Sequence, residues 1–387
     1  MRPVWVDVDL DAVADNLRSI KGVVGPTPEI MAVVKANGYG HGAVQIARVA
    51  LENGATRLGV ATVDEGLELR KAGFGVPILV LGYTSPEQAR EVVRYGLTQT
   101  VYTLANAQAL SEAAVEARRR IRVHLKVETG LGRLGVQHGE AAVVLARRLL
   151  RLPSLEVEGI FTHLAAAGSH LDFTRLQIDL FQETLSRLRR EGIEFPLAHA
   201  ANSAGAIAHP ESCFDMVRVG IALYGLLPGP TLGEKVSFLR PALSWLARVA
   251  HAKRVKSGTT IGYGRLFKAP VETTIATLPL GYADGYSRVL TGKAQVLVEG
   301  KRLPVVGAVC MDQIMIDAGA LPGIEEGEAV HLIGRSGGDE ISADEVARWM
   351  GTINYEIVCA ISRRVPRVYS QNGKVVGVQG FPMRSDQ

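Results

Sequence analysis

The 387-residue chain has few cysteines and few aromatic residues, and it contains no long apolar run. Its three cysteines, Cys213, Cys310 and Cys359, are widely spaced and form no CxxC pair. This argues against a disulfide scaffold or a metal cluster, and it favours a reducing compartment. No apolar stretch is long enough to predict a membrane span, and the acid-containing start at residues 4–9 does not resemble a signal peptide. We therefore expect a soluble cytoplasmic protein with no metal and no membrane partner.

The chain also lacks a strong excess of charge of either sign. Its formal net charge is +4, from 43 basic and 39 acidic residues, so a nucleic-acid partner is not expected. The densest basic stretches, 118–120 and 187–190, fall at the ends of predicted helices, where arginine interacts favourably with the helix dipole. Because the length exceeds that of a typical single core, we expect two domains.

The first part of the chain alternates short apolar strands with amphipathic helices. A strand at 5–10 and a helix at 11–21 come first. Eight strand-like runs then begin at Ile30, Leu58, Pro77, Gln99, Ile121, Leu155, Pro196 and Met216. Leucines at helical spacing predict one of the intervening helices at 174–191. Eight strands separated by helices predict an α/β fold, a (β/α)8 barrel, with a doubly wound sheet as the weaker alternative.

The pattern changes after Leu226. A turn-rich stretch at 227–233 is followed by alternating runs at 245–253, 293–299 and 303–316, and only 343–350 and a stretch near Tyr355 look helical. A Glu299-Gly-Lys turn joins two of the predicted strands. The sequence therefore predicts a barrel domain at 1–235 and a mainly β domain at 236–387.

Lys35 ends an apolar run, in Met31-Ala-Val-Val-Lys35-Ala-Asn-Gly38-Tyr39-Gly40-His41-Gly42. Glycines allow positive φ and a close approach of the backbone to a ligand. An amine held against apolar groups loses charge stabilisation and becomes a usable base or nucleophile, which is what a Schiff-base lysine requires. Taken alone, Lys35 is more simply a strand-end lysine whose ammonium reaches water.

Other polar residues also fall where predicted barrel strands end, and such ends share one rim of a barrel. They are Arg133 beyond the fifth strand, His163 after the sixth, Asn202 and Ser203 after the seventh, and Arg218, Gly220 and Ile221 in and after the eighth. A serine at a helix N-terminus is usually only a cap. Beside a glycine, in the loops where barrels commonly hold phosphate, it also suits an anion. Together with Lys35, this predicts pyridoxal 5′-phosphate as the cofactor.

At these positions the chain resembles the alanine racemases, the barrel-type (fold type III) pyridoxal-phosphate family, over its whole length. The matching segments are Lys35-Ala-Asn-Gly-Tyr-Gly-His-Gly, Gly130-Leu-Gly-Arg133-Leu-Gly, Ala201-Asn-Ser203, Arg218-Val-Gly-Ile-Ala-Leu-Tyr-Gly225, Ile261-Gly-Tyr263-Gly-Arg265, Gly281-Tyr282-Ala-Asp-Gly285 and Cys310-Met311-Asp312. Glu128 and Leu131 stand where Asp and Met are expected, and neither change removes a functional group.

The resemblance implies a role for each of these residues. Lys35 binds the cofactor and is one base, and Tyr263, bonded to His163, is the second base on the opposite face. Arg218 bonds the pyridine nitrogen. The phosphate contacts are Tyr39, Ser203, Gly220, Ile221 and Tyr355, and Asn202 also lies in the cofactor site. Arg133 reaches the phenolic oxygen of the cofactor and the substrate carboxylate, oriented by a Lys126 that could be carbamylated. Met311 binds the carboxylate through its N–H, while Tyr282 and Tyr355 narrow the entrance.

These roles suit racemisation, which takes the α-proton from one face and returns a proton to the other. Lysine and tyrosine have reference pKa values near ~10, so both must be lowered to act near neutrality. An arginine at the pyridine nitrogen can only donate, which leaves that nitrogen largely unprotonated and disfavours transamination.

The resemblance thus implies interconversion of L-alanine and D-alanine for peptidoglycan, by a homodimer in which each β domain covers the barrel of its partner. A racemase of other or broader specificity, such as serine, stays open, although Tyr282 and Tyr355 favour a small side chain. A non-catalytic pyridoxal-phosphate-binding barrel would lack the β domain and the Tyr263 motif. A decarboxylase of the same barrel class is disfavoured by the tyrosine base.

Overall fold

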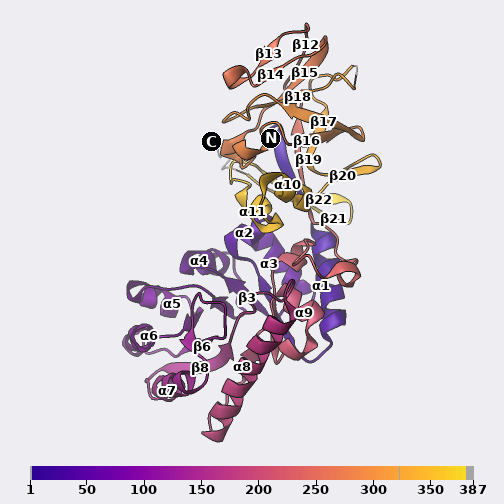
Figure 1. Ribbon diagram of the computed structural model, residues 1–387. Coiled ribbons are helices and arrows are strands. Elements are labelled where there is room, and N and C mark those ends of the chain that lie inside the picture. Colours follow the sequence, from indigo (N-terminus) through magenta and orange to yellow (C-terminus); the bar gives the residue numbers. More distant parts are fainter. Residues whose placement is uncertain (1, 322, 381–387) are drawn as a thin grey trace. The chain divides into compact units, whose positions relative to one another are not determined.

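The structure is a computed structural model that describes residues 2–321 and 323–380 (Figure 1). The chain folds into two compact units. The barrel unit consists of Val13–Gly38 and Ala43–Arg240, and the β unit combines the N-terminal residues through Ala12, the segment Tyr39–Gly42 and the chain from Pro241 onward. The division is therefore not a single cut in the sequence, because two short N-terminal segments belong to the unit built mainly from C-terminal residues.

The barrel unit confirms the predicted (β/α)8 architecture. Its parallel strands are hydrogen-bonded in the order β10-β2-β3-β4-β5-β6-β8-β9. They are β2 (Glu29–Val33), β3 (Arg57–Val60), β4 (Ile78–Val80), β5 (Thr98–Val101), β6 (Ile121–Glu128), β8 (Leu155–Phe161), β9 (Leu197–His199) and β10 (Met216–Val219). The hydrogen bonds Asp215 N–H to Ala198 O (3.0 Å) and Arg218 N–H to Ala201 O (3.1 Å) join the last two strands and close the ring.

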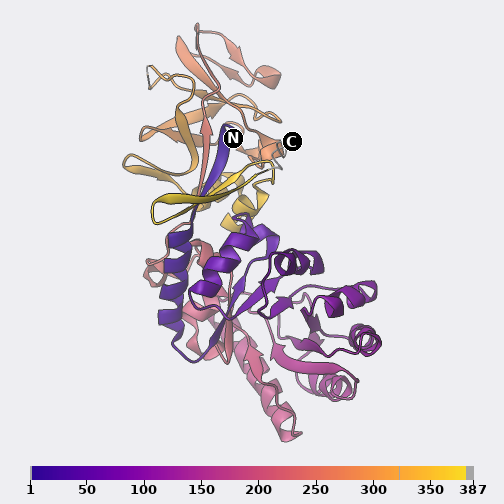
Figure 2. The same cartoon turned by 180° about the vertical axis from the view of Figure 1, so that it is seen from behind.

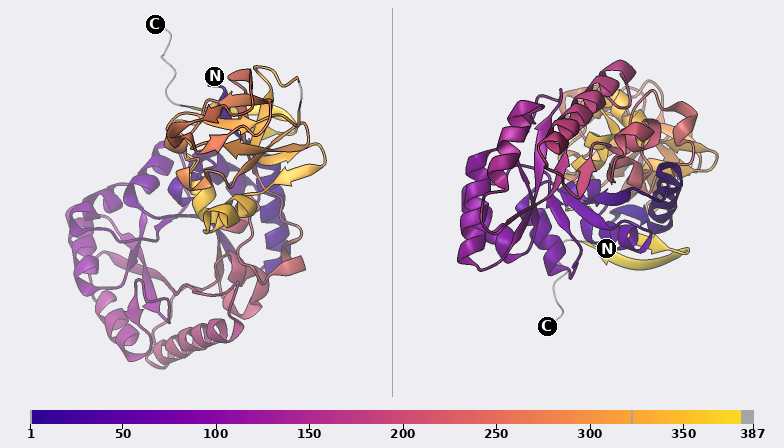
Figure 3. Two further views of the ribbon diagram at one scale, coloured as in Figure 1. Left: turned by 45° about the horizontal axis from the view of Figure 1, so that its top comes forward. Right: turned by 90° about the horizontal axis from the view of Figure 1, so that it is seen from below.

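Helices surround this ring of strands, as the indigo-to-magenta part of Figure 3 shows. They are α1 (Leu10–Val24), α2 (Lys35–Tyr39), α3 (Ala43–Glu52), α4 (Val63–Lys71), α5 (Ala89–Arg94), α6 (Leu104–Glu116), α7 (Glu140–Leu149), α8 (Leu171–Arg190) and α9 (Ser203–Ala208), and a short β7 (Val136–Gln137) pairs with β6. The predicted helix at 174–191 is confirmed as α8. Its buried face differs from the leucine pattern, because Thr174, Gln177 and Phe181 are buried whereas Leu176 is 49% exposed.

The β unit is mainly β, as predicted. Its large sheet has the order β12-β15-β18-β17-β16-β19-β11-β1-β21-β22, with β20 paired to β19. The strands are β1 (Val4–Asp9), β11 (Leu243–Arg248), β12 (His251–Val255), β15 (Thr273–Leu278), β16 (Gln295–Val298), β17 (Lys301–Val306), β18 (Ile314–Asp317), β19 (Ala329–Ser336), β20 (Asp339–Ile341), β21 (Arg367–Gln371) and β22 (Lys374–Gln379). A separate hairpin of β13 (Thr260–Ile261) and β14 (Phe267–Lys268) and the helices α10 (Ala343–Met350) and α11 (Asn354–Ala360) complete it.

Strand β1 lies inside this sheet, antiparallel to β11 and parallel to β21. Figure 2 shows it in indigo among orange and yellow strands. Two predicted runs are each divided. The run 245–253 becomes β11 and β12, which pair with different strands, and the run 303–316 folds back on itself as the antiparallel pair β17 and β18. The predicted turn is confirmed, since Glu299 (φ 48°) and Gly300 (φ 78°) connect β16 to β17.

No helix in the described residues is both long and apolar enough to cross a membrane. Each unit has an apolar interior of its own. In the barrel unit, Met31, Leu79 and Met216 from three strands pack together. In the β unit, Ile261, Ile275 and neighbouring residues form a core under the β13–β14 hairpin.

Candidate functional site

The carboxyl ends of the barrel strands carry the polar residues predicted for this unit. Lys35 follows β2, Lys126 lies in β6, Arg133 in the loop after β6, His163 after β8, Asn202 and Ser203 after β9, and Arg218 in β10, followed by Gly220 and Ile221. Because the strands are parallel, their carboxyl ends form one rim. The structure therefore brings these residues to the same end of the barrel unit.

The backbone directly after Lys35 forms a left-handed turn. Residues 36–38 have φ of 51–61° and ψ of 46–48°. This conformation costs about 1–2 kcal/mol for each residue with a Cβ. Glu65 helps to hold it, since its Oε1 accepts the Ala36 N–H at 2.6 Å while its Oε2 accepts the Ala61 N–H at 2.7 Å. Strained backbone held by such contacts is typical of functional sites, and here it fixes how the chain departs from Lys35.

Arg218 is buried, and its guanidinium donates to four neutral acceptors. NH1 donates to His199 Nδ1 at 2.8 Å, and NH2 donates to the carbonyls of Thr162 (2.8 Å) and Ala200 (2.9 Å) and to His163 Nδ1 (3.1 Å). Burial and the nearby Arg133 lower the pKa of Arg218 to about 9, which still leaves the group cationic near neutrality. Because a guanidinium only donates, both imidazoles accept through Nδ1 and carry their proton on Nε2.

The charges at this rim are mainly positive. Burial and Arg218 hold the pKa of His163 well below its ordinary value, so its imidazole is neutral. Burial, followed by Arg218 and Arg133, does the same for the pKa of Lys126, whose Nζ lies 4.3 Å from the centre of the Phe161 ring. The site therefore favours an anionic ligand and offers neutral nitrogen atoms beside it.

Ser203 joins the ends of β9 and β10. Its Oγ accepts the N–H groups of Gly220 (2.9 Å) and Ala222 (3.3 Å). The N-cap of α9 is Asn202, whose Oδ1 accepts the Gly205 N–H at 2.9 Å, so Ser203 is not the cap. With both lone pairs of Ser203 used, its hydroxyl proton is left to donate to an acceptor such as a phosphate oxygen.

A carboxylate holds the loop that carries Arg133. Glu128 accepts the N–H groups of Gly130 (2.5 Å), Leu131 (2.6 Å) and Arg133 (3.2 Å). Gly135 closes the loop, because a Cβ there would lie 2.7 Å from the backbone nitrogen of Glu128. Glu128 thus positions the backbone from which the Arg133 side chain projects.

In the β unit, Tyr263 lies on a short connection between β13 and β14 and is 72% exposed. Gly262 and Gly264, on either side of it, both have φ of 72°. A Cβ on Gly262 would lie 3.2 Å from the Ala308 backbone nitrogen, so the connection packs closely on the segment that leads to Met311. The local fold therefore presents the phenol of Tyr263 outward on a supported turn.

Two further predicted residues of this unit, Tyr282 and Met311, lie on adjoining segments. The Tyr282 N–H donates to Cys310 O at 3.0 Å. Gly281 permits this approach, because a Cβ there would lie 2.1 Å from Cys310 O and 2.5 Å from Met311 O. Tyr282 is 40% exposed and Met311 is 53% exposed.

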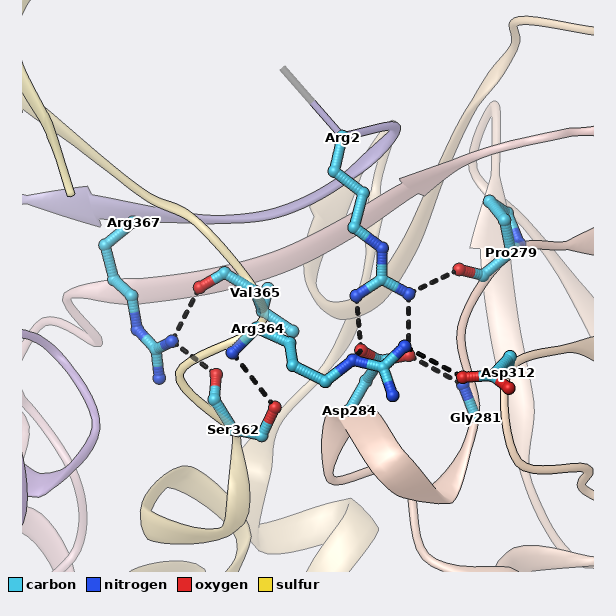
Figure 4. A network of polar contacts seen from close by, with 9 residues as sticks. All are labelled: Arg2, Pro279, Gly281, Asp284, Asp312, Ser362, Arg364, Val365 and Arg367. Carbon is cyan, nitrogen blue, oxygen red and sulfur yellow. Dashed lines mark hydrogen bonds and ion pairs between the residues drawn. The ribbon is translucent and has the colours of Figure 1, made fainter. Parts of the chain in front are cut away.

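An ion-pair network around one buried carboxylate fixes these two segments (Figure 4). Asp284 is fully buried, receives an ion pair from the Arg2 guanidinium and accepts the Gly281 N–H at 3.1 Å. Arg364 lies 3.3 Å from Asp284 and donates to Asp312, the residue after Met311, at 2.8 Å. The carboxylate therefore connects the Tyr282 turn to the Met311 segment through Arg364.

The structure also brings Tyr39 and Tyr355 together in the β unit. Their ring centres are 6.2 Å apart at an interplanar angle of 57°. A Cβ on Gly40 would lie 2.1 Å from Val358 O, so the segment after Tyr39 packs tightly against α11. Burial raises the pKa of Tyr355 to about 12, which keeps its phenol protonated near neutrality.

Sequence reasoning missed the contacts of Glu65, His124, Glu158 and His199. A signal was present for His124 and Glu158, since each is a polar residue in mid-strand with uncharged neighbours, Val123 and Leu125 for the first and Val157 and Gly159 for the second. Glu65 stands three residues after Thr62, the capping-box spacing that the structure shows at the start of α4.

Sequence profiles of two domains match the chain. The alanine racemase N-terminal domain matches residues 8–228, and the alanine racemase C-terminal domain matches residues 242–369. The alanine racemase of Desulforamulus reducens is 49% identical over 368 residues, covering 95% of this chain and 99% of the relative. That of Symbiobacterium thermophilum is 50% identical over 370 residues, covering 95% and 97%.

Solved structures are similar over the same length. An alanine racemase of Clostridium difficile 630 has a TM-score of 0.95 at 37% identity and covers 99% of this chain and 100% of its own. The alanine racemase of Bacillus anthracis with bound L-Ala-P has a TM-score of 0.93 at 42% identity, covering 98% and 97%. A histidine racemase of Leuconostoc mesenteroides has a TM-score of 0.87 at 32% identity, covering 96% and 99%.

Proposed function

Because this chain belongs to the alanine racemase family, it is an isomerase of alanine, and we propose that it uses pyridoxal 5′-phosphate as cofactor and Lys35 and Tyr263 as its two bases. One observation carries the proposal: the buried Arg218 donates only to neutral acceptors among the described residues, at the rim that also holds Lys35. A positive rim beside a lysine suits a cofactor that is both an aldehyde and a phosphate ester.

The residues present fit that cofactor. The unused hydroxyl proton of Ser203 would donate to a phosphate oxygen, with Tyr39, Ile221 and Tyr355 as further phosphate contacts and Asn202 elsewhere in the cofactor site. The Gly220 N–H is already bonded to Ser203, so we assign Gly220 to positioning that serine. When bound, pyridoxal phosphate supplies the electron-withdrawing ring that acidifies the α-hydrogen of an amino acid.

Lys35 and Tyr263 would move the protons at the α-carbon. Lys35 accepts the α-proton on one face and Tyr263 donates on the other, and their roles exchange in the reverse direction. His163 supports the tyrosine, because its Nδ1 accepts from Arg218 and its Nε2–H is left to donate to a phenolate oxygen. Arg218, which can only donate, holds the ring nitrogen of the cofactor unprotonated and thereby limits transamination.

The remaining residues would bind the substrate. Arg133, on the loop held by Glu128, pairs with the alanine carboxylate, and the Met311 N–H donates to the same group. The strongly lowered pKa of Lys126 favours a neutral amine, the form that can react with carbon dioxide to give a carbamate beside Arg133. Tyr282 and Tyr355 narrow the entrance to suit a methyl side chain.

We further propose a homodimer that shares its active sites, with Tyr263 of the partner subunit completing each one. The exposed Tyr263, Tyr282 and Met311 on neighbouring segments of the β unit support this, because a second copy would cover them. The cysteines are few, widely spaced and without a CxxC pair, which supports a reducing, cytoplasmic location, and D-alanine made there would serve peptidoglycan synthesis.

Incubation with L-alanine or D-alanine and separation of the enantiomers tests the proposed function. The protein purified with pyridoxal phosphate should convert either enantiomer to an equal mixture, with serine and histidine turned over more slowly. Bound cofactor without racemisation would favour a non-catalytic binding protein. Faster turnover of serine or histidine would overturn the assignment to alanine.

A further inference from the structure

Arg218 is the inner end of a buried chain of hydrogen bonds. Its NH1 donates to His199 Nδ1 at 2.8 Å, His199 Nε2 lies 2.8 Å from His124 Nδ1, and His124 Nε2 lies 3.0 Å from Glu158 Oε2. All four residues are buried, and the Phe161 ring stacks on His199 with ring centres 4.7 Å apart and an interplanar angle of 3°. The chain thus connects a guanidinium near the rim to a carboxylate on β8 through two imidazoles.

Both ends of this series of hydrogen bonds require that each proton is donated from the Arg218 side toward Glu158. A guanidinium only donates, so His199 accepts at Nδ1 and carries its proton on Nε2. That N–H can bond only to an unprotonated Nδ1 of His124, which leaves the His124 proton on Nε2. A carboxylate only accepts, so Glu158 receives this last proton, and a single pair of tautomers satisfies every group.

The surroundings keep the two rings neutral and the carboxylate charged. Burial lowers the pKa of both histidines, and for His199 the nearby Arg218 adds to the effect. Burial raises the pKa of Glu158, but the His124 hydrogen bond and Arg57 outweigh it and lower the pKa to about 2. Arg57 NH1 lies 3.1 Å from both oxygens of Glu158, which holds the carboxylate in place.

We propose that Glu158 is a positioning residue for racemisation. Acting through His124 and His199, it keeps the Nδ1 of His199 as the acceptor that orients the Arg218 guanidinium. The inferred effect on the reaction rests on the proposed function. The predicted tautomers of His124 and His199 depend only on the hydrogen bonds between Arg218 and Glu158. A side chain at 158 that cannot accept leaves the chain with one unsatisfied group. Either the His124 N–H has no acceptor, or both rings reverse and His199 presents an N–H to the N–H of Arg218.

The tautomers can be measured by NMR of the full chain labelled with 15N-histidine, with and without pyridoxal phosphate. Neutral Nε2–H and Nδ1–H imidazoles and the imidazolium differ in their 15N shifts, and His124→Gln and His199→Gln assign the signals. We expect both rings to be neutral and protonated at Nε2 near pH 7.5. This measurement needs no active enzyme. An imidazolium or an Nδ1–H form at either position would overturn the proposal.

Two variants at 158 and one matched control test the effect on the reaction. Glu158→Leu should give a second set of histidine signals, lower kcat about tenfold with little change in KM, and increase formation of pyridoxamine phosphate. Glu158→Gln keeps an acceptor and should retain the wild-type tautomers and most of kcat. Glu156→Leu, on the same strand but exposed, should match wild type in all three measurements.

Each outcome separates this proposal from the proposed function. If the wild-type protein does not racemise alanine, the proposed function is overturned, and the histidine tautomers still test the predicted hydrogen bonds from Arg218 to Glu158. Glu158→Leu with wild-type kcat and by-product overturns the positioning role while the function stands. If Glu158→Leu does not fold, failure of Glu158→Gln to keep the Nε2–H tautomers overturns it instead.

Discussion

Acidification should destabilise this protein through its buried histidines. His163 and His199 have pKa values held well below 6.5, first by burial and then by Arg218. Below pH 6.5 the unfolded chain protonates these rings while the folded chain does not, so the unfolded state binds more protons and stability falls with pH. Each such histidine costs about 1.4 kcal/mol for each pH unit below 6.5. The pair should therefore lower the free energy of unfolding by about 3 kcal/mol at pH 5.5.

Other groups do not reverse this expectation. His124 also has a lowered pKa because of burial and adds to the loss. Glu158, with a folded pKa of about 2 against an ordinary 4.5, contributes stability that is lost only as the pH falls below about 4.5. Between pH 7.5 and 5.5 the buried histidines therefore outweigh Glu158 in the change of stability.

Urea unfolding at pH 7.5, 6.5 and 5.5, followed by circular dichroism, measures the effect. His199→Gln should remove about 1.4 kcal/mol of the loss between pH 7.5 and 5.5, whatever it does to stability at pH 7.5. His251 is exposed and on β12, so His251→Gln is the control and should leave the loss unchanged. A total loss under about 1 kcal/mol would refute the reasoning, because the rings would then titrate normally in the folded state.

Four further substitution experiments follow from the site. Lys35→Ala should abolish racemisation in both directions and prevent covalent attachment of the cofactor, read by borohydride reduction and peptide mapping. Arg218→Glu should retain the cofactor but form pyridoxamine phosphate, because a carboxylate favours a protonated ring nitrogen. Asp284→Asn should lower the free energy of unfolding by about 3 kcal/mol and raise KM for alanine, since the Tyr282 turn loses its ion pairs. Mixed dimers of inactive Lys35→Ala and Tyr263→Ala should regain about a quarter of native activity after random exchange.

For each of these four predictions, one outcome would contradict it. A pyridoxyl group on another lysine refutes the assignment of Lys35, and an Arg218→Glu enzyme without pyridoxamine phosphate removes the electronic argument. The claim that the Asp284 ion pairs stabilise the Tyr282 turn fails if Asp284→Asn has the free energy of unfolding and the KM of wild type. Asp179→Asn, at an exposed position on α8, is the control. Confirmed subunit exchange with no recovered activity would place Lys35 and Tyr263 of each site in one chain.

Much of the fold could be predicted because the barrel strands are short buried runs between helices. All eight predicted starts, from Ile30 to Met216, fall within two residues of an observed strand start. The positions of Lys35 and Arg218 on their elements followed from the same pattern. Tertiary pairing could not be predicted this way. The membership of β1 in the β unit depends on partners more than 230 residues away in sequence.

The contacts of the site were harder to predict than its residues. His124 on β6 and His199 on β9 meet across β8, whose pairing with β6 shifts register between Val123 and His124. A shift of this kind turns a side chain toward a different neighbour and leaves no trace in the apolar pattern. The departure at Glu128 looked neutral from its type alone, and only the loop geometry shows that its carboxylate organises the backbone around Arg133.

The position of β1 inside the sheet delays its pairing while the protein is being synthesised on the ribosome. This strand is made before β11 and β21, which flank it and are completed only after residues 248 and 371 have been made. At 5–20 residues per second, β1 waits on the order of ten to fifty seconds for β11. During that interval a strand with two open edges, whose Val4, Val6 and Val8 are buried in the folded protein, is exposed on the nascent chain. A fragment starting at Pro241 would lack an internal strand, whereas a circular permutant that places residues 2–12 after β22 would supply β1 last, next to strands already formed.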